Sequence, residues 1–157
     1  MDGKIALQRS IELMEIADAA YVTNIDEHGF PQTRAMFNLR RKEQFPALAP
    51  LFKDHHEDFL AYFTTNTSSS KIAQLKNAPK VSIYYCKPAD FRGLMLSGEM
   101  AVVADRAEKE KVWQKGWEMY YPGGVHDPDH TVLRLRPMMA KYYHQLDRYH
   151  FNLSGQR

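Results

Sequence analysis

The sequence predicts a small α+β domain, mainly β, in which an antiparallel sheet curls into a barrel. About six segments alternate apolar and polar residues with the period of half-buried strands, and short turns join most of them. No glycine-rich phosphate loop follows a predicted strand, which disfavours a Rossmann fold. The 157 residues, 44% of them apolar, suit one globular domain over residues 1–157.

The first half of the chain predicts a helix, a hairpin and a further strand. Leu7, Ile11 and Met14 recur at the spacing of a one-sided helix. Pro46 and Pro50 interrupt any regular period after the hairpin and indicate a loop with one short helix. In order, the predicted elements are a helix over 4–20, strands over 21–25 and 32–39, a loop over 41–57 and a strand over 59–65.

The second half begins with a short capped helix. The serines and threonines at 67–70 can satisfy the free N–H groups of a helix start, and Pro79 follows the helix end. Asp105 resembles the start of a capping box and predicts a helix that packs through Trp113 and Trp117. The remaining predictions are strands over 81–85 and 94–103, a loop over 121–129, strands over 131–136 and 139–143, and disorder near His144 and His150.

Composition argues against several classes of partner. The net charge of +2 is too small to indicate nucleic-acid binding, and the basic run Arg40–Lys42 is predicted to be a solvated turn. The apolar runs fall far short of the roughly 18 residues of a membrane helix, so we expect no membrane span. The single cysteine, Cys86, excludes an intrachain disulfide, and we expect a buried thiol in a cytoplasmic protein.

The histidines do not indicate a metal site. The densest cluster runs from His126 to His130, where Pro128 opposes a helix that would bring both imidazoles to one face. Neither a cysteine nor a third histidine stands at a usual zinc spacing. We therefore expect a solvated loop and no metal.

One constellation indicates phosphate binding. Arg34 lies on a predicted strand, and Ser69, Ser70 and Lys71 lie at a predicted helix start. Free helix N–H groups, hydroxyls and two cations together suit a phosphate. A capped surface helix and a salt-bridged strand arginine explain the same spacing, so both interpretations stay open at this point.

Ordered motifs over residues 11–143 resemble the pyridoxamine 5'-phosphate oxidase-like flavin-binding split-barrel superfamily. These motifs are Thr33–Met36, Phe63–Asn66, Ser69–Lys71, Pro79–Ser82 and Ser97–Val102. Further segments, at 111–113, 120–124, 127–128 and 133–137, are similar to its general stress protein branch. The resemblance implies a six-stranded antiparallel split β-barrel with flanking helices, which forms a homodimer and holds FMN at the subunit interface.

The resemblance also implies roles for individual residues. Arg34 and Lys71 would bind the phosphate, with Ser69 and Ser70 assisting. Trp113 would approach from the dimer partner, or pack in the core as an ordinary helix-face tryptophan. The residues implied beside the flavin ring are Ala35, Met36 and Phe37, and those implied at its polar edge are Phe63, Thr64 and Thr65. The loop over 41–57 is longer than the family pattern implies, and we expect it to cover one side of the flavin.

Departures from the family pattern limit what function the resemblance implies. Ser70 stands where the oxidases carry an arginine, Gly93 where they carry a glutamine, and their long carboxy-terminal segment is missing after residues 148–150. True pyridoxamine phosphate oxidation is therefore not expected. The leading hypothesis is an FMN-dependent oxidoreductase with a small-molecule electron donor or acceptor, FAD being the other flavin left open.

Two alternatives accompany that hypothesis. No side chain stands out as a general acid or base, so a flavin-binding stress protein that acts as a carrier or sensor without turnover explains the same residues. The serine at position 70 also leaves open a relative that binds another heteroaromatic ligand.

Overall fold

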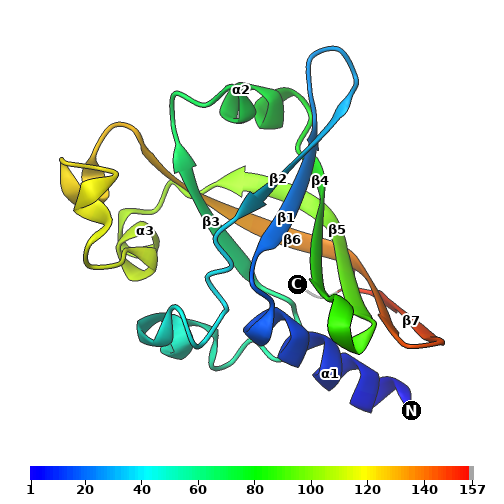
Figure 1. The fold of residues 1–157 in the computed structure, drawn as a ribbon. Helices are drawn as coiled ribbons and strands as arrows, with labels where there is room; N and C mark the ends of the chain where they lie inside the picture. Colours follow the sequence, from blue (N-terminus) through cyan, green and yellow to red (C-terminus); the bar gives the residue numbers. More distant parts are fainter. Residues whose placement is uncertain (156–157) are drawn as a thin grey trace.

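One antiparallel sheet of seven strands forms the framework of the protein. The structure is a computed structural model, and it describes residues 1–155. The strands follow the order β2-β1-β4-β5-β6-β3, and β7 also pairs with β6 (Figure 1). The strands are β1 (Ala20–Ile25), β2 (Pro31–Met36), β3 (Ala61–Asn66), β4 (Lys80–Lys87), β5 (Arg92–Val102), β6 (His130–His144) and β7 (Asp147–Asn152). This curled, open sheet confirms the predicted α+β split barrel.

Three α-helices and four short 3₁₀ helices surround the sheet. Helix α1 packs beneath β4, β5 and β7, and α2 lies at the opposite end beside β1 (Figure 1). The α-helices are α1 (Gly3–Ile16), α2 (Ser70–Asn77) and α3 (Arg106–Val112). The 3₁₀ helices are η1 (Pro46–Phe52), η2 (Pro88–Asp90), η3 (Trp117–Met119) and η4 (Gly124–His126).

The three α-helices begin at residues that cap them. The carboxylate of Asp2 accepts a hydrogen bond of 2.9 Å from the Ile5 N–H at the start of α1. Ser69 and Asp105 accept in the same way from the free N–H groups of α2 and α3. Such caps satisfy donors that a helix leaves unpaired, so these residue types fix where each helix starts.

Two apolar clusters hold these elements together. The larger fills the barrel with the inward residues of the strands, such as Val22, Ile83 and Leu96, and α1 covers it with Leu13 and Met14. The smaller lies outside the sheet and joins η1, α3 and η3; its buried residues are Leu39, Phe45, Leu48, Phe52, Tyr62, Val103, Val112, Trp117 and Val132. Alternation along the strands thus supplies one core, and the irregular segments build the other.

Strand β6 is longer than the sequence predicts, because the expected strands over 131–136 and 139–143 are one strand. Pro137 lacks the N–H that a central strand needs, yet it sits opposite Gly98, where the register with β5 shifts. A side chain at Gly98 would overlap the carbonyl oxygen of Arg136. Glycine therefore allows the close approach that lets β6 continue through its proline.

The carboxy-terminal segment is also more ordered than expected. Residues 147–152 form β7, which pairs with β6 along its second half. Tyr149 and Phe151 pack against the barrel core, and Leu153 is buried. Chain ends are generally expected to be disordered, but the packing of these apolar side chains holds β7 against the barrel.

Four local predictions were wrong. Arg40 is buried rather than solvated, and so is His130 in the histidine cluster, while Cys86 is half-buried rather than fully buried. Helix α3 ends at Val112, before its expected tryptophan face, and Gly116 adopts a left-handed φ of 99° just before η3. Each difference comes from contacts between segments that local patterns do not reveal.

Candidate functional site

A pocket of about 610 Å³ lies where the sheet fails to close. It runs between β2 and β3, the two end strands of the sheet order, and the loop around η3 forms a further wall. Its volume falls in the range of roughly 300–1,000 Å³ that small-molecule sites occupy. The lining residues are Asp18, Ala19, Arg34, Ala35, Met36, Phe37, Arg41, Gln44, Thr64, Thr65, Asn66, Lys71, Trp117, Tyr120 and Tyr121.

Lys71 brings a positive charge to this pocket from the first turn of α2. Its side chain is buried, with 6% of the residue exposed, and the ammonium donates a hydrogen bond of 2.8 Å to Thr65 Oγ1. The carbon stem of the lysine thus packs beside β3 while its charge faces the pocket. Ser69 fixes this arrangement because its hydroxyl caps the helix at the Lys71 N–H.

Arg34 brings a second positive charge from β2. Its Nη1 donates to Asn24 Oδ1 at 2.7 Å. Asn24 in turn donates to Gln74 Oε1 at 2.8 Å, and Gln74 donates to Glu27 at 2.9 Å. The arginine is therefore positioned by a chain of amides that links β2, β1 and α2, with a carboxylate only at its far end.

The positive charges of Lys71 and Arg34 repel each other in this pocket. Burial, and then the nearby Arg34 guanidinium, lower the pKa of Lys71 to about 8. Within residues 1–155, neither cation has a carboxylate within ion-pair distance. Two facing cations with neutral partners are the arrangement expected of a site that binds an anion.

Aromatic rings form the other end of the pocket. Phe37 and Tyr120 are more than two-fifths exposed, whereas Trp117 and Tyr121 are buried behind them. The Trp117 ring packs edge-on against Phe45, with 6.2 Å between ring centroids. The lining thus offers flat apolar surfaces as well as cations, as a planar ring bearing an anionic tail requires.

Packing behind the aromatic wall fixes its position. His130 is 2% exposed, and its ring centroid lies 4.6 Å from that of Tyr121 and 5.1 Å from that of Trp113. Burial lowers the pKa of His130, which favours the neutral ring among these aromatic neighbours. Trp113 therefore supports the wall from behind, in contact with Trp117 and Tyr121.

The structure brings most of the predicted site residues together. Those that line the pocket are Arg34, Ala35, Met36, Phe37, Thr64, Thr65 and Lys71. The others do not: Phe63 lies in the barrel core, Ser69 and Ser70 form the start of α2, and Trp113 lies behind the aromatic wall.

Sequence reasoning missed several lining residues. Arg41 and Gln44, at the start of the loop over 41–57, line one side. Trp117 was expected on a helix face, and it instead lies on η3, with Tyr120 just after it. The motif at 120–124 was a usable signal, because a tyrosine pair followed by proline and glycines indicates an aromatic loop.

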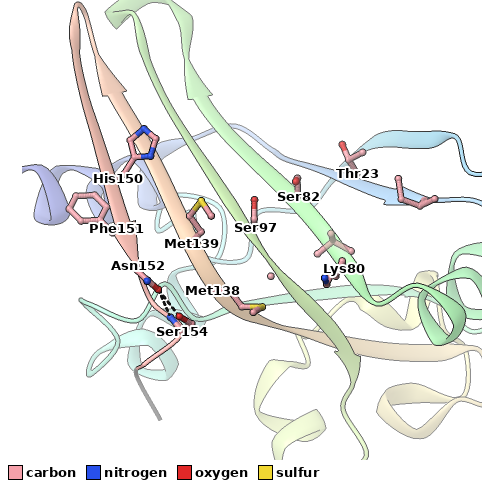
Figure 2. A pocket seen from close by; sticks show the side chains of 13 residues that line it. Thr23, Lys80, Ser82, Ser97, Met138, Met139, His150, Phe151, Asn152 and Ser154 are labelled. Carbon is pink, nitrogen blue, oxygen red and sulfur yellow. Dashed lines mark hydrogen bonds between the residues drawn. The ribbon is translucent and has the colours of Figure 1, made fainter.

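A larger groove, of about 770 Å³, lies on a different face of the protein. Figure 2 shows its side chains, which come from β1, β4, β5, β6 and β7. Ser97, Ser82 and Thr23 follow one another across the sheet, and Met139 and Phe151 lie on the β6 and β7 side of them. The groove lacks a pair of unpartnered cations beside aromatic walls, so we place the candidate cofactor site in the pocket between β2 and β3.

Two other kinds of site find no support in the described chain. Among residues 1–155, no group of three or more histidine, cysteine, aspartate and glutamate side chains is arranged to hold a metal ion. None of the helices described is both long enough and apolar enough to span a membrane.

Fold and pocket together define a split-barrel protein with a cation-bearing pocket between its edge strands. The chain belongs to the pyridoxamine 5'-phosphate oxidase-like family, whose profile matches residues 24–154. This membership and the general stress protein relatives below confirm the family resemblance of the sequence motifs. Among curated proteins, no match was found.

Solved structures show the same fold. A Clostridium acetobutylicum protein related to general stress protein 26 of B. subtilis, of the pyridoxinephosphate oxidase family, is 33% identical, with a TM-score of 0.76 over 98% of this chain and 97% of that one. General Stress Protein 26 from Bacillus anthracis is 18% identical, with a TM-score of 0.67 over 92% and 98%. A heme binding protein from Mycobacterium smegmatis is 10% identical, with a TM-score of 0.67 over 94% and 57%.

Proposed function

We propose that this protein is a flavoprotein that binds FMN in the pocket between β2 and β3 and acts as an oxidoreductase. The observation that carries the proposal is the pair of cations, Arg34 and Lys71, that face one pocket without a carboxylate partner within residues 1–155. A phosphate accepts several charge-assisted hydrogen bonds, and its negative charge relieves the repulsion between the two cations. Ser69 and Ser70 assist through the start of α2 that they form.

The remainder of the pocket suits the flavin ring. β2 and β3 are edge strands, so each presents backbone N–H and C=O groups that no neighbouring strand uses. The free backbone groups along β2 and β3 can bind the polar edge of the ring beside Ala35, Met36 and Thr64, and Thr65 adds a hydroxyl. Phe37 and the aromatic wall supply apolar surface for the rest of the ring.

Haem fits these residues less well. Of the side chains that bind a haem iron in proteins, the lining contains no histidine or cysteine, and Met36, Tyr120 and Tyr121 are the other candidate ligands in it. The one pair of cations formed by Arg34 and Lys71 matches a single phosphate, so FMN is the favoured flavin.

When bound, the flavin supplies the electron and hydride chemistry, and the chain supplies binding and orientation. Arg34 and Lys71 hold the phosphate end, while the edge strands fix the ring. Trp117 and Tyr121 limit water on one side. Asp18 is the one carboxylate in the lining; it is almost fully exposed and pairs with Arg41 at 3.2 Å, which does not suit a general base.

The apolar groove of Figure 2 supports a homodimer. Tyr21, Ile25 and Met139 each expose more than a third of their surface on that side of the sheet. We propose that a second copy covers this face. We also propose a cytoplasmic location, because a chain with one cysteine forms no intrachain disulfide.

The first prediction concerns flavin affinity. Arg34→Ala and Lys71→Met should each weaken FMN binding by about 1.5–3 kcal/mol, the worth of a hydrogen bond to a charged group. Fluorescence titration of the ligand-free protein with FMN measures this. Lys76→Met, at an exposed position of α2, is the matched control and should bind as the wild type does. Unchanged affinity in both pocket variants would place the phosphate elsewhere.

The second prediction concerns pH. The ligand-free Lys71 has a pKa of about 8, and a bound phosphate raises that pKa. FMN binding therefore takes up a proton above about pH 8, and affinity should fall there by up to about tenfold per pH unit. Lys71→Met should show a flatter profile between about pH 8 and 9.5. Parallel profiles in the two proteins would contradict this role for Lys71.

The third prediction separates the oxidoreductase from a flavin carrier or sensor. An oxidoreductase should be reduced by a nicotinamide donor under anaerobic conditions and reoxidised by a small acceptor, faster than free FMN at the same concentration. Rapid mixing that follows the visible flavin band measures both half-reactions. A protein that binds FMN yet matches the free cofactor is a carrier or sensor.

The fourth prediction concerns assembly. Light scattering should give about twice the chain mass of 18.3 kDa at micromolar concentration. Ser97→Arg, in the middle of the groove, should shift the mass toward one chain because the new charge would be buried. Ser68→Arg, at an exposed loop position, is the control. A wild type that scatters as a monomer would remove the dimer.

A further inference from the structure

A separate cavity of about 500 Å³ lies beside η1 and the turn that follows β2. Arg40, Phe45 and Phe52 form its inner wall, and Lys53 and His56 are exposed residues at its edge. It shares no lining residue with the pocket between β2 and β3. Nothing in the proposed flavin chemistry uses it.

Arg40 is the unusual feature of this cavity. The residue is 3% exposed, and its guanidinium lies over the Phe52 ring, 4.9 Å from the ring centroid. Nη1 donates to the Leu60 carbonyl at 3.0 Å, and Nη2 donates to the His55 carbonyl at 2.8 Å. The buried Nε has no hydrogen-bond partner among residues 1–155. A guanidinium has five N–H donors, so most of this group's donor capacity is unused.

The charge of Arg40 is poorly compensated. No carboxylate of the described chain lies within ion-pair distance of it. The carboxylates that act on it from further away are already paired: Glu15 with Lys42 at 2.8 Å, and Asp58 with His55 at 2.6 Å. A buried cation without a close anion is costly, and an incoming anion would offset that cost.

The other lining residues of the cavity indicate which kind of anion it suits. Its walls are mostly apolar, since Leu39, Phe45, Pro50 and Phe52 contribute to them. Lys53 adds positive charge at the edge, and Glu15 is the one carboxylate in the lining. An inorganic anion would leave the aromatic surfaces unused, whereas an anion with an apolar body would cover them.

We infer that this cavity binds a small organic monocarboxylate, with its carboxylate toward Arg40 and its apolar body against Phe45 and Phe52. The exposed Lys53 would attract the carboxylate from solvent. The site does not require FMN. Yet Phe45 also packs against Phe37 and Trp117, with ring centroids 5.8 and 6.2 Å apart, and both of those rings line the flavin pocket.

Calorimetric titration of the purified protein with benzoate and hexanoate tests the inference, with benzamide and hexanamide as uncharged matches. The carboxylates should bind at least about tenfold more tightly than their amides, as loss of a charge-assisted hydrogen bond implies. Lys53→Ala should weaken carboxylate binding severalfold. Equal affinity for acids and amides, or tighter binding of inorganic phosphate, would overturn the inference.

A variant that fills the cavity tests the inference without substituting Arg40, because a change at that buried residue would also affect folding. Ala49→Trp fills the cavity from the exposed side of η1 and should abolish carboxylate binding. Ala47→Trp, on the same 3₁₀ helix but outside the lining, should leave it intact. Carboxylate binding that survives Ala49→Trp would place the ligand elsewhere, and the absence of carboxylate binding by the wild type at millimolar concentration would remove the site.

Discussion

Lys71 and Arg34 carry positive charge into one pocket, and neutral oxygens, of Thr65 and Asn24, hold them there. A carboxylate in either place would have neutralised the pocket and left little attraction for an anion. The amide chain through Asn24 and Gln74 keeps the arginine in position without that loss. The surrounding fold serves this arrangement, since β2, β3 and α2 meet only because the barrel stays open between its edge strands.

Local sequence patterns were enough to predict the sheet, because most inward positions of the strands alternate with outward ones. They failed where a distant segment decided the outcome. Pro137 would end an isolated strand, and only its pairing with Gly98 allows β6 to run through it. Arg40 looks like a surface residue until the carbonyls of His55 and Leu60 are brought to it by the loop that follows η1.

The candidate site divides in the same way. Residues that lie on regular elements, such as Arg34 on β2 and Lys71 on α2, could be chosen from their types and their place in the predicted structure. The aromatic wall could not, because Gly116 turns the chain after α3 and sends Trp117 and Tyr121 to a place that no helical period describes. His130, which packs behind that wall, lies in a segment that the sequence predicts to be a solvated loop, and it gives no local sign of its burial.

Strand β6 pairs with β5 along most of its length, with β3 over its first half and with β7 over its second. No neighbour can detach without exposing hydrogen bonds of a strand that the others share. Native-state hydrogen exchange would therefore report β3, at the pocket, and β7, beside the apolar groove, as parts of one cooperative opening unit. Detachment of either strand would therefore unfold the whole domain rather than fray one edge of the sheet.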